Sequence, residues 1–279
     1  MKQIIALSSF FLVFNSHAMM RSLNTAATGM AAQEENVNTI SNNIANVNTV
    51  GYKKQRVEIE DLLYETRQEA GARSSADTQY NVGVQTGSGA RVSAVRKEFT
   101  QGSPQITNNP FDLMINGSGF FGIALPNNEV RFTRDGSFNV DNTGVMVTRE
   151  GYRLFPNFTF PPGTKSVNIS EDGTVEAFLN NQVEPVNLGQ IPIFTFINPV
   201  GLRNVGGNLY ATTTSSGQPI QNIAGESNAG PVMQGALESS NVSIMSEMTN
   251  LIRAQRAYEM NSKVMGVADQ MLQTINNIR

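Results

Sequence analysis

The sequence predicts an α+β fold, with long N- and C-terminal helices paired as a coiled-coil-like domain and an all-β domain inserted between them. Apolar residues recur every seven positions near the N-terminus, and a second seven-residue repeat runs through the C-terminal segment. Short alternating runs bounded by turn residues fill the middle of the chain. At 279 residues, the chain is long enough for one or two compact units.

The N-terminal helix is expected over residues 19–50. Its apolar stripe has the a/d spacing of a coiled-coil seam, and Asn46, Asn48 and Gly51 mark its end. The stripe positions are Leu23, Ala26, Met30, Gln33, Val37, Ile40, Ile44 and Val47.

The C-terminal helix is expected over residues 236–279. Its stripe positions are Ile244, Met248, Leu251, Ala254, Tyr258, Met265, Ala268, Leu272 and Ile275. A long helix with one narrow apolar stripe cannot bury that stripe alone. The two terminal helices are therefore predicted to pack against each other.

Short strands separated by turn residues predict a β domain over residues 110–210. The runs are bounded by pairs such as Asp135-Gly136 and Asp172-Gly173, which favour turns. Strands are expected at residues 111–116, 119–125, 130–133, 137–140, 145–148, 166–169, 174–178 and 191–196. Residues 51–109 are expected to be an extended linker, and residues 211–235 a loose return linker, because Gly, Ser, Thr, Gln and Asn dominate them.

Residues 1–18 differ from the rest of the chain. Lys2 precedes an apolar run over residues 4–14, and Ser16-His17-Ala18 follows, which is the pattern of a cleavable secretion signal. The run is shorter than the roughly 20 residues that a membrane-spanning helix needs. Two interpretations stand: a signal-like extension, or a mis-assigned start upstream of Met19 or Met20.

Composition excludes several classes of function. A net charge of -3 provides no basic field for nucleic acid or anionic lipid. Cysteine is absent and the only histidine, His17, lies in the extension, so thiolate sites, histidine metal sites and a Ser-His-Asp triad are excluded from the rest of the chain. The sequence predicts no metal, no nucleic-acid partner and no membrane span.

Two patterns that suggest enzyme chemistry have structural explanations. Gly117, Gly119 and Gly122 match the GxGxxG dinucleotide fingerprint, but a strand-like run follows where that fingerprint requires a helix. Carboxylates such as Asp141 and Asp172 lie in turns, where they bond the backbone, and this explanation is favoured over a glycosidase carboxylate pair. We therefore predict no catalytic residue and no cofactor, and expect that the protein is not an enzyme.

Residues 41–54, Ser-Asn-Asn-Ile-Ala-Asn-Val-Asn-Thr-Val-Gly-Tyr-Lys-Lys, resemble the N-terminal signature of flagellar rod and hook proteins, a helix end followed by a Gly-Tyr-Lys turn. Blocks at residues 109–121, 132–138, 234–242 and 255–263 resemble the distal rod members of that family. The resemblance covers nearly everything after Met19. The signature residues are Ser41, Asn42, Asn43, Ala45, Asn46, Gly51, Tyr52, Gln255, Arg256, Ala257 and Tyr258.

This resemblance implies a structural subunit of the distal rod of the bacterial flagellar basal body, which crosses the periplasm to the outer layers. Such a subunit polymerises into a helical tube that transmits torque from motor to hook in cell motility. The paired helices would line the tube as an inner domain, with the β domain outside. The implied partners are further copies of the chain, proximal rod and hook proteins, basal-body ring proteins and the flagellar type III export apparatus.

The implied assembly interface comprises the stripe of the N-terminal helix together with Ile244, Met248, Leu251, Tyr258, Met265, Leu272 and Ile275. Two alternatives stay open. One is a proximal rod protein or another axial subunit, and the other is a secreted carbohydrate-binding or wall-cleaving β domain flanked by helices.

Overall fold

The computed structural model divides the chain into two compact units. Unit 1 comprises Met1–Asn42, Gln55–Arg96 and Met245–Arg279, and unit 2 comprises Asn43–Lys54 and Lys97–Ile244. The structure describes residues 2–73, 79–127, 129–180 and 184–277, with the backbone alone for residues 2–19, 275 and 276. Each unit is therefore assembled from segments that are far apart in the sequence.

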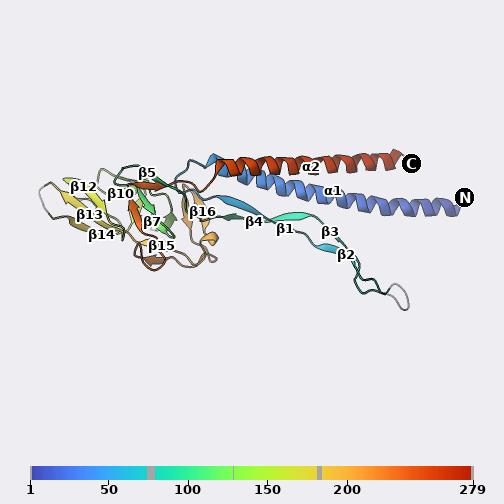
Figure 1. Cartoon of the computed structure of the whole chain (residues 1–279), viewed down its shortest axis with the longest axis horizontal. Helices are drawn as coiled ribbons and strands as arrows, with labels where there is room; N and C mark the ends of the chain where they lie inside the picture. Colours follow the sequence, from blue (N-terminus) through green and yellow to red (C-terminus); the bar gives the residue numbers. More distant parts are fainter. Residues whose placement is uncertain (1, 74–78, 128, 181–183, 278–279) are drawn as a thin grey trace. The chain divides into compact units, whose positions relative to one another are not determined.

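Unit 1 is built on two long helices, α1 (Lys2–Ala45) and α2 (Ile244–Asn277), which run side by side in opposite directions (Figure 1). Small residues lie at their contact: a methyl group on Gly29 of α1 would lie 2.9 Å from Asn261 Nδ2 of α2. The presence of two terminal helices is confirmed, but their bounds differ from the expected ones. Helix α1 spans Lys2–Ala45 and not residues 19–50, and α2 begins at Ile244 and not at residue 236, because residues 236–238 form a strand. The backbone of residues 2–18 thus continues the helix, and the signal-like interpretation of that extension stays a prediction.

Two β ribbons complete unit 1. Strand β1 (Gln55–Asp61) pairs with β4 (Ala90–Lys97), and β2 (Tyr64–Gln68) pairs antiparallel with β3 (Val84–Gly87). The sequence predicts an extended linker over residues 51–109, which includes these strands. The segment is extended, but its strands pair with each other, because backbone N–H and C=O groups in a packed unit require partners.

The main sheet of unit 2 has nine strands, in the order β16-β17-β8-β7-β11-β10-β9, with β15 joined to β7 and β18 joined to β15. Each of these pairings is antiparallel. The strands are β7 (Phe120–Ala124), β8 (Val130–Thr133), β9 (Phe138–Val140), β10 (Met146–Thr148), β11 (Arg153–Phe155), β15 (Ile193–Thr195), β16 (Arg203–Gly206), β17 (Leu209–Ala211) and β18 (Ile220–Asn222).

Smaller sheets surround this one. A three-stranded antiparallel sheet contains β12 (Thr164–Ile169), β13 (Thr174–Leu179) and β14 (Val186–Gln190). Two further pairs join early and late parts of unit 2: β6 (Leu113–Ile115) with β19 (Val232–Gln234), and β5 (Pro104–Ile106) with β20 (Ala236–Glu238). A 3₁₀ turn, η1 (Pro199–Gly201), precedes β16. Residues 211–235, expected to be a loose return, therefore contribute paired strands.

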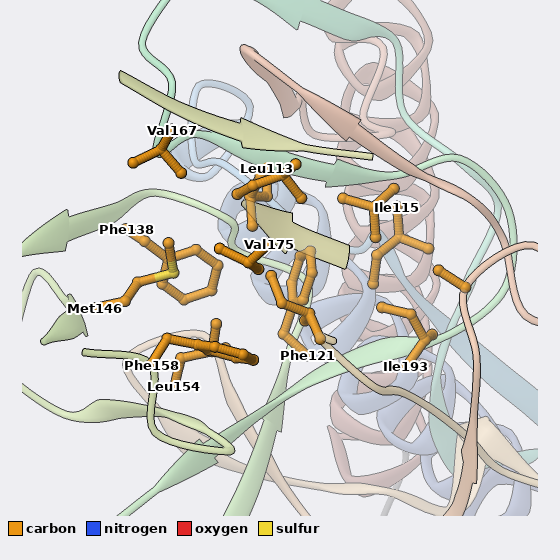
Figure 2. Packing of buried hydrophobic residues seen from close by; sticks show 14 of the residues in the cluster. Leu113, Ile115, Phe121, Phe138, Met146, Leu154, Phe158, Val167, Val175 and Ile193 are labelled. Atoms are coloured by element: carbon orange, nitrogen blue, oxygen red, sulfur yellow. The ribbon is translucent and has the colours of Figure 1, made fainter. Parts of the chain in front are cut away.

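The core of unit 2 lies between these sheets (Figure 2). Phe121 and Ile193 project from neighbouring strands of the main sheet, and Val175 reaches the same cluster from β13. The rings of Phe121 and Phe138 meet edge to face at 5.4 Å between centroids, a favoured aromatic geometry. This β-rich middle region confirms the α+β class that the sequence predicts.

Candidate assembly interface

The inner row of α2 follows a seven-residue spacing. Glu247, Ala254 and Ala268 are buried, and Asn261 lies half-buried between the two alanines. The sequence analysis placed Met248 in this row, but Met248 is 45% exposed and Glu247 is 1% exposed. Counting back in sevens from Ala268 reaches residue 247, so Glu247 and not Met248 is the inward position of this row.

The predicted stripe residues differ in how far their side chains are buried. On α1, Ala26 and Ile40 are buried, whereas Leu23, Met30, Gln33, Val37 and Ile44 are half-buried. Val47 is also half-buried, but it lies in the turn after α1. On α2, Leu251, Met265 and Leu272 are half-buried, and Ile244, Met248 and Tyr258 are exposed. Ile275 lies in α2, but its side chain is outside the described residues. The single chain therefore leaves most of the predicted interface incompletely covered.

The outward face of α2 carries large apolar side chains that the sequence analysis did not place there. The spacing of four of them, at positions 260, 264, 267 and 271, puts them on one side of a helix. All are between 48% and 60% exposed: Met260, Val264, Val267 and Met271. Met245 and Ile252 add to this exposed surface nearer the start of α2, at 78% and 49%.

In unit 2, the Gly-Tyr-Lys turn of the signature follows α1, and its geometry requires the glycine. Gly51 has φ of 68°, in the left-handed region, and its N–H donates to the carbonyl oxygen of Glu238 at 2.8 Å. A Cβ on Gly51 would lie 2.7 Å from the backbone of Arg134 and Asp135. Both the backbone conformation and the close approach therefore require glycine at this position.

Three charged residues meet behind this turn and form the ion cluster: Lys53, Arg134 and Glu238. The carboxylate of Glu238 accepts hydrogen bonds from Lys53 Nζ at 2.6 Å and from Arg134 Nη1 at 3.3 Å. The three residues are 0%, 4% and 1% exposed, respectively. Two cations around one carboxylate give the ion cluster a net charge of +1, so Glu238 is the counter-ion of both.

The burial of the ion cluster shifts the pKa values of its two cations. Loss of solvent lowers the pKa of Lys53, the Glu238 charge opposes that effect, and the neighbouring Arg134 lowers this pKa further. Burial likewise lowers the pKa of Arg134. Lys53 Nζ also donates to the Thr100 carbonyl at 2.8 Å, and Gly102 N–H donates to Glu238 Oε1 at 3.0 Å. The cluster thus joins four separate segments of unit 2.

Asn241 adds further hydrogen bonds between the segments that the ion cluster joins. Its Oδ1 accepts the Lys54 N–H at 2.7 Å, and its Nδ2 donates to the Glu98 carbonyl and to Thr100 Oγ1, both at 2.8 Å. We refer to residues 51–54, 98–102, 134 and 238–241 as the junction. Through it, the segment leaving α1 and the segment entering α2 are held to the β sheets of unit 2.

The other signature residues lie close to the two helices. Tyr52 donates its hydroxyl to Asn43 Oδ1 at 3.1 Å, and Asn43 is only 1% exposed. Ser41 Oγ donates to the Val37 carbonyl at 2.8 Å, and Thr49 Oγ1 donates to Asn46 Oδ1 at 3.1 Å. Asn42, Ala45, Gln255, Arg256 and Tyr258 are exposed, and Ala257 is half-buried. The buried Asn43 therefore holds the turn rather than facing solvent.

Sequence reasoning missed Lys53, Arg134, Glu238 and Asn241 as a group. Each of them lies in one of the sequence blocks that resemble flagellar rod proteins, and this resemblance was the signal that could have singled them out. Nothing in local spacing connects them, because Lys53 and Glu238 are 185 residues apart.

Lys97 is a third desolvated cation in unit 2, outside the ion cluster. Its Nζ lies 4.4 Å from the ring centroid of Tyr210 and donates to Asn204 Oδ1. Burial lowers its pKa from 10.5 to about 8. Burial raises the pKa of the Tyr210 hydroxyl. The lysine charge is therefore stabilised by an aromatic face and an amide, which offset its desolvation only in part.

In the described part of the chain, no three or more acidic or histidine side chains gather as metal ligands. Neither described helix combines the length and apolar content needed to cross a membrane. Strand β7 follows Gly117 and Gly119, where a dinucleotide fingerprint needs a helix.

Comparison with known families gives three matches. Residues 23–53 match the family described as flagella basal body rod protein. Residues 114–177 match the flagellar hook protein FlgE/F/G D1 domain, and residues 233–278 match the flagellar basal body rod FlgEFG protein C-terminal family.

Curated relatives match along nearly their whole length. The flagellar basal-body rod protein FlgG of Borreliella burgdorferi is 47% identical over 263 residues, covering 94% of this chain and 99% of the relative. FlgG of Caulobacter vibrioides is 46% identical, with 93% and 100% covered. FlgG of Bacillus subtilis is 35% identical, with 94% and 100% covered.

Among solved structures, the flagellar hook protein FlgE2 of Helicobacter pylori aligns with a TM-score of 0.24 and 14% identity. The alignment covers 67% of this chain and 43% of that chain, a likeness too weak to carry an argument.

Proposed function

The chain belongs to the FlgG family of flagellar basal-body rod proteins, and from this premise we propose that it polymerises into a helical tube that transmits torque from motor to hook. It is a structural subunit of the distal rod of the flagellar basal body. The proximal rod alternative is set aside, because relatives at 42 to 47% identity are FlgG proteins. The family is structural, and we assign no catalytic role to this chain.

The observation that carries the polymer proposal is the apolar surface of α2. A soluble helix normally turns its apolar residues inward and leaves polar residues outside. Here Met260, Val264, Val267 and Met271 remain about half exposed on one side of α2. Covering the rest of each side chain contributes on the order of 1 kcal/mol, and contiguous apolar patches of this kind mark protein contacts.

We propose that copies of α1 and α2 pack against one another as the inner domain of the tube. The half-buried stripe residues of both helices and the outward face of α2 form the assembly interface in this arrangement. A contact repeated by rotation and rise builds an open helical filament. Many such contacts per subunit make the tube stiff, which torque transmission requires.

The domain organisation follows the same proposal. The helices α1 and α2 serve as the rod helices, residues 110–210 as the core of the outer β domain, and the segments between them as connections. The junction attaches the segment that leaves α1 and the segment that enters α2 to the β domain through its buried hydrogen bonds. Proximal rod, hook and ring proteins are the expected neighbours, and the flagellar type III apparatus the expected export route.

A charge on the outward face of α2 tests the polymer proposal. Val267→Asp places a carboxylate where a neighbouring copy is expected, at a site 49% exposed in the single chain. Burial of an unpaired charge is costly, so we expect filament growth to be lost while the thermal midpoint of the monomer stays within about 2 °C. Gln270→Asp is the matched control, because Gln270 is an exposed polar residue of the same helix. Electron microscopy and light scattering measure growth, and normal filaments from Val267→Asp contradict the proposal.

A further inference from the structure

Unit 1 contains a cleft that carries hydrogen-bond donors and has no role in the contacts proposed so far. Its volume is about 550 Å³, and α1, α2 and the β2–β3 ribbon line it. The lining includes two arginines, Arg21 of α1 and Arg67 of β2, together with the hydroxyl-bearing Thr25 and Thr86. Such a combination of guanidinium and hydroxyl donors suits a carboxylate ligand.

The donors of this cleft are incompletely satisfied. Arg21 Nη1 pairs with Glu65 Oε2 at 2.5 Å, but Arg21 Nη2 is buried without a hydrogen-bond partner. Arg67 is exposed and makes no ion pair with any described residue. Buried donors are nearly always paired in folded proteins, so an unmet donor beside a second cation indicates a missing acceptor.

The same unit carries an acidic pair without a counter-ion. Glu34 and Glu35 are adjacent on α1, both are exposed, and neither forms an ion pair with a described residue. Thirteen residues of helix separate Arg21 from Glu34, which corresponds to an axial distance of about 20 Å at 1.5 Å per residue. The cleft and the acidic pair therefore lie at different positions along the axis of α1.

We propose that the cleft of Arg21 and Arg67 receives Glu34 and Glu35 of a second copy of this chain. The inference rests on the proposed polymer and names one of its contacts. In the proposed tube this contact repeats head-to-tail from one copy to the next, as an open helical filament requires. Its roughly 20 Å offset sets the axial stagger between neighbouring helices.

Charge complementarity supplies selectivity that the apolar stripes lack. Apolar stripes on parallel helices tolerate sliding by a heptad, whereas charged pairs across an interface fix the register. Exposed ion pairs contribute little on their own. In the cleft the carboxylates lie beside the partly buried guanidinium of Arg21 and hydroxyl groups, where solvent screens the charges less.

A charge-swap experiment with the full chain tests this contact. Arg67→Glu and Glu35→Arg each create a like-charge pair, and we expect each to raise the critical concentration for filament growth at least tenfold. The double variant carrying both changes restores an opposite-charge pair, so its critical concentration is expected to return to within about threefold of the unaltered chain. Arg21 is left unchanged because it pairs with Glu65.

Glu226→Arg is the matched control, since Glu226 is an exposed carboxylate of unit 2 with no ion pair to a described residue. It changes net charge by the same amount as Glu35→Arg and should leave the critical concentration unaltered. If either single variant polymerises like the unaltered chain, or the double variant is no better than the worse single, the contact is wrong. The rod assignment then still stands, because filaments of the unaltered chain and the response to Val267→Asp test it separately.

Discussion

Removing the carboxylate of the ion cluster should damage unit 2 far more than removing one of its cations. Glu238→Gln leaves Lys53 and Arg134 buried without a counter-ion. Lys53→Met instead leaves a neutral pair, because Glu238 keeps its bonds to Arg134 and to the Gly102 N–H. The buried cluster therefore keeps a net charge of +2 after Glu238→Gln and a net charge of zero after Lys53→Met, although both substitutions break the same 2.6 Å contact.

The magnitudes follow from the cluster geometry. Two unit charges about 4 Å apart interact by roughly 4 kcal/mol at an effective dielectric constant of about 20. Glu238→Gln removes two such attractions and keeps the repulsion between the cations, and removing one partner of a buried ion pair costs about 3 to 5 kcal/mol. Lys53→Met removes one attraction, ends the repulsion with Arg134 and relieves the desolvation of the amine. We expect about 4 kcal/mol for Glu238→Gln and about 1 to 2 kcal/mol for Lys53→Met.

Urea unfolding of the full chain measures both effects. The chain has no tryptophan, so tyrosine fluorescence is the probe, and buried Tyr52 and Tyr210 report on unit 2. Glu226→Gln, at an exposed carboxylate, controls for loss of a negative charge. If Lys53→Met costs as much as Glu238→Gln, the carboxylate is not the common counter-ion and the reasoning fails.

Two further predictions concern the same unit. Gly51→Ala should lower the free energy of unfolding by at least about 2 kcal/mol in the same urea assay, since alanine disfavours φ of 68° and its methyl meets backbone at 2.7 Å; an unchanged midpoint contradicts this. Lys97 has a folded-state pKa of about 8, below its ordinary 10.5, so between these pH values the unfolded state binds more protons and stability should rise with pH. Lys97→Met should abolish that rise between pH 8 and 10, and an identical pH profile in the variant refutes the assignment.

Local patterns in the sequence predict most of the secondary structure. The heptad repeats predict both helices because side-chain periodicity is a property of each helix by itself. Turn residues between alternating runs place β8 at its observed residues and β7, β9, β10 and β13 to within one or two. Strands β11, β14, β16 and β17 were not predicted, because these three- to five-residue segments acquire their pairing from distant strands.

The assembly face was predicted in part. Spacing of seven indicated Leu251, Met265 and Leu272, which lie half-buried in α2. Spacing alone did not decide between residues 247 and 248. They lie four and three positions before Leu251, and residues at either of these separations lie on nearly the same side of a helix. The folded chain decided between them, because it buries Glu247 and leaves Met248 and Val267 exposed.

The sequence by itself determined the helices, the β-rich middle, the glycine turn at residue 51 and the family signature, because each depends on residues close together in the chain. Only the tertiary structure decided that Glu238 meets Lys53 across 185 residues and Arg134 across 104. The same holds for the cleft that joins Arg21 to Arg67 through two helices and a ribbon. A charged residue carries no local mark of its partner, because that partner is chosen by the path of the backbone and by the burial that makes pairing necessary.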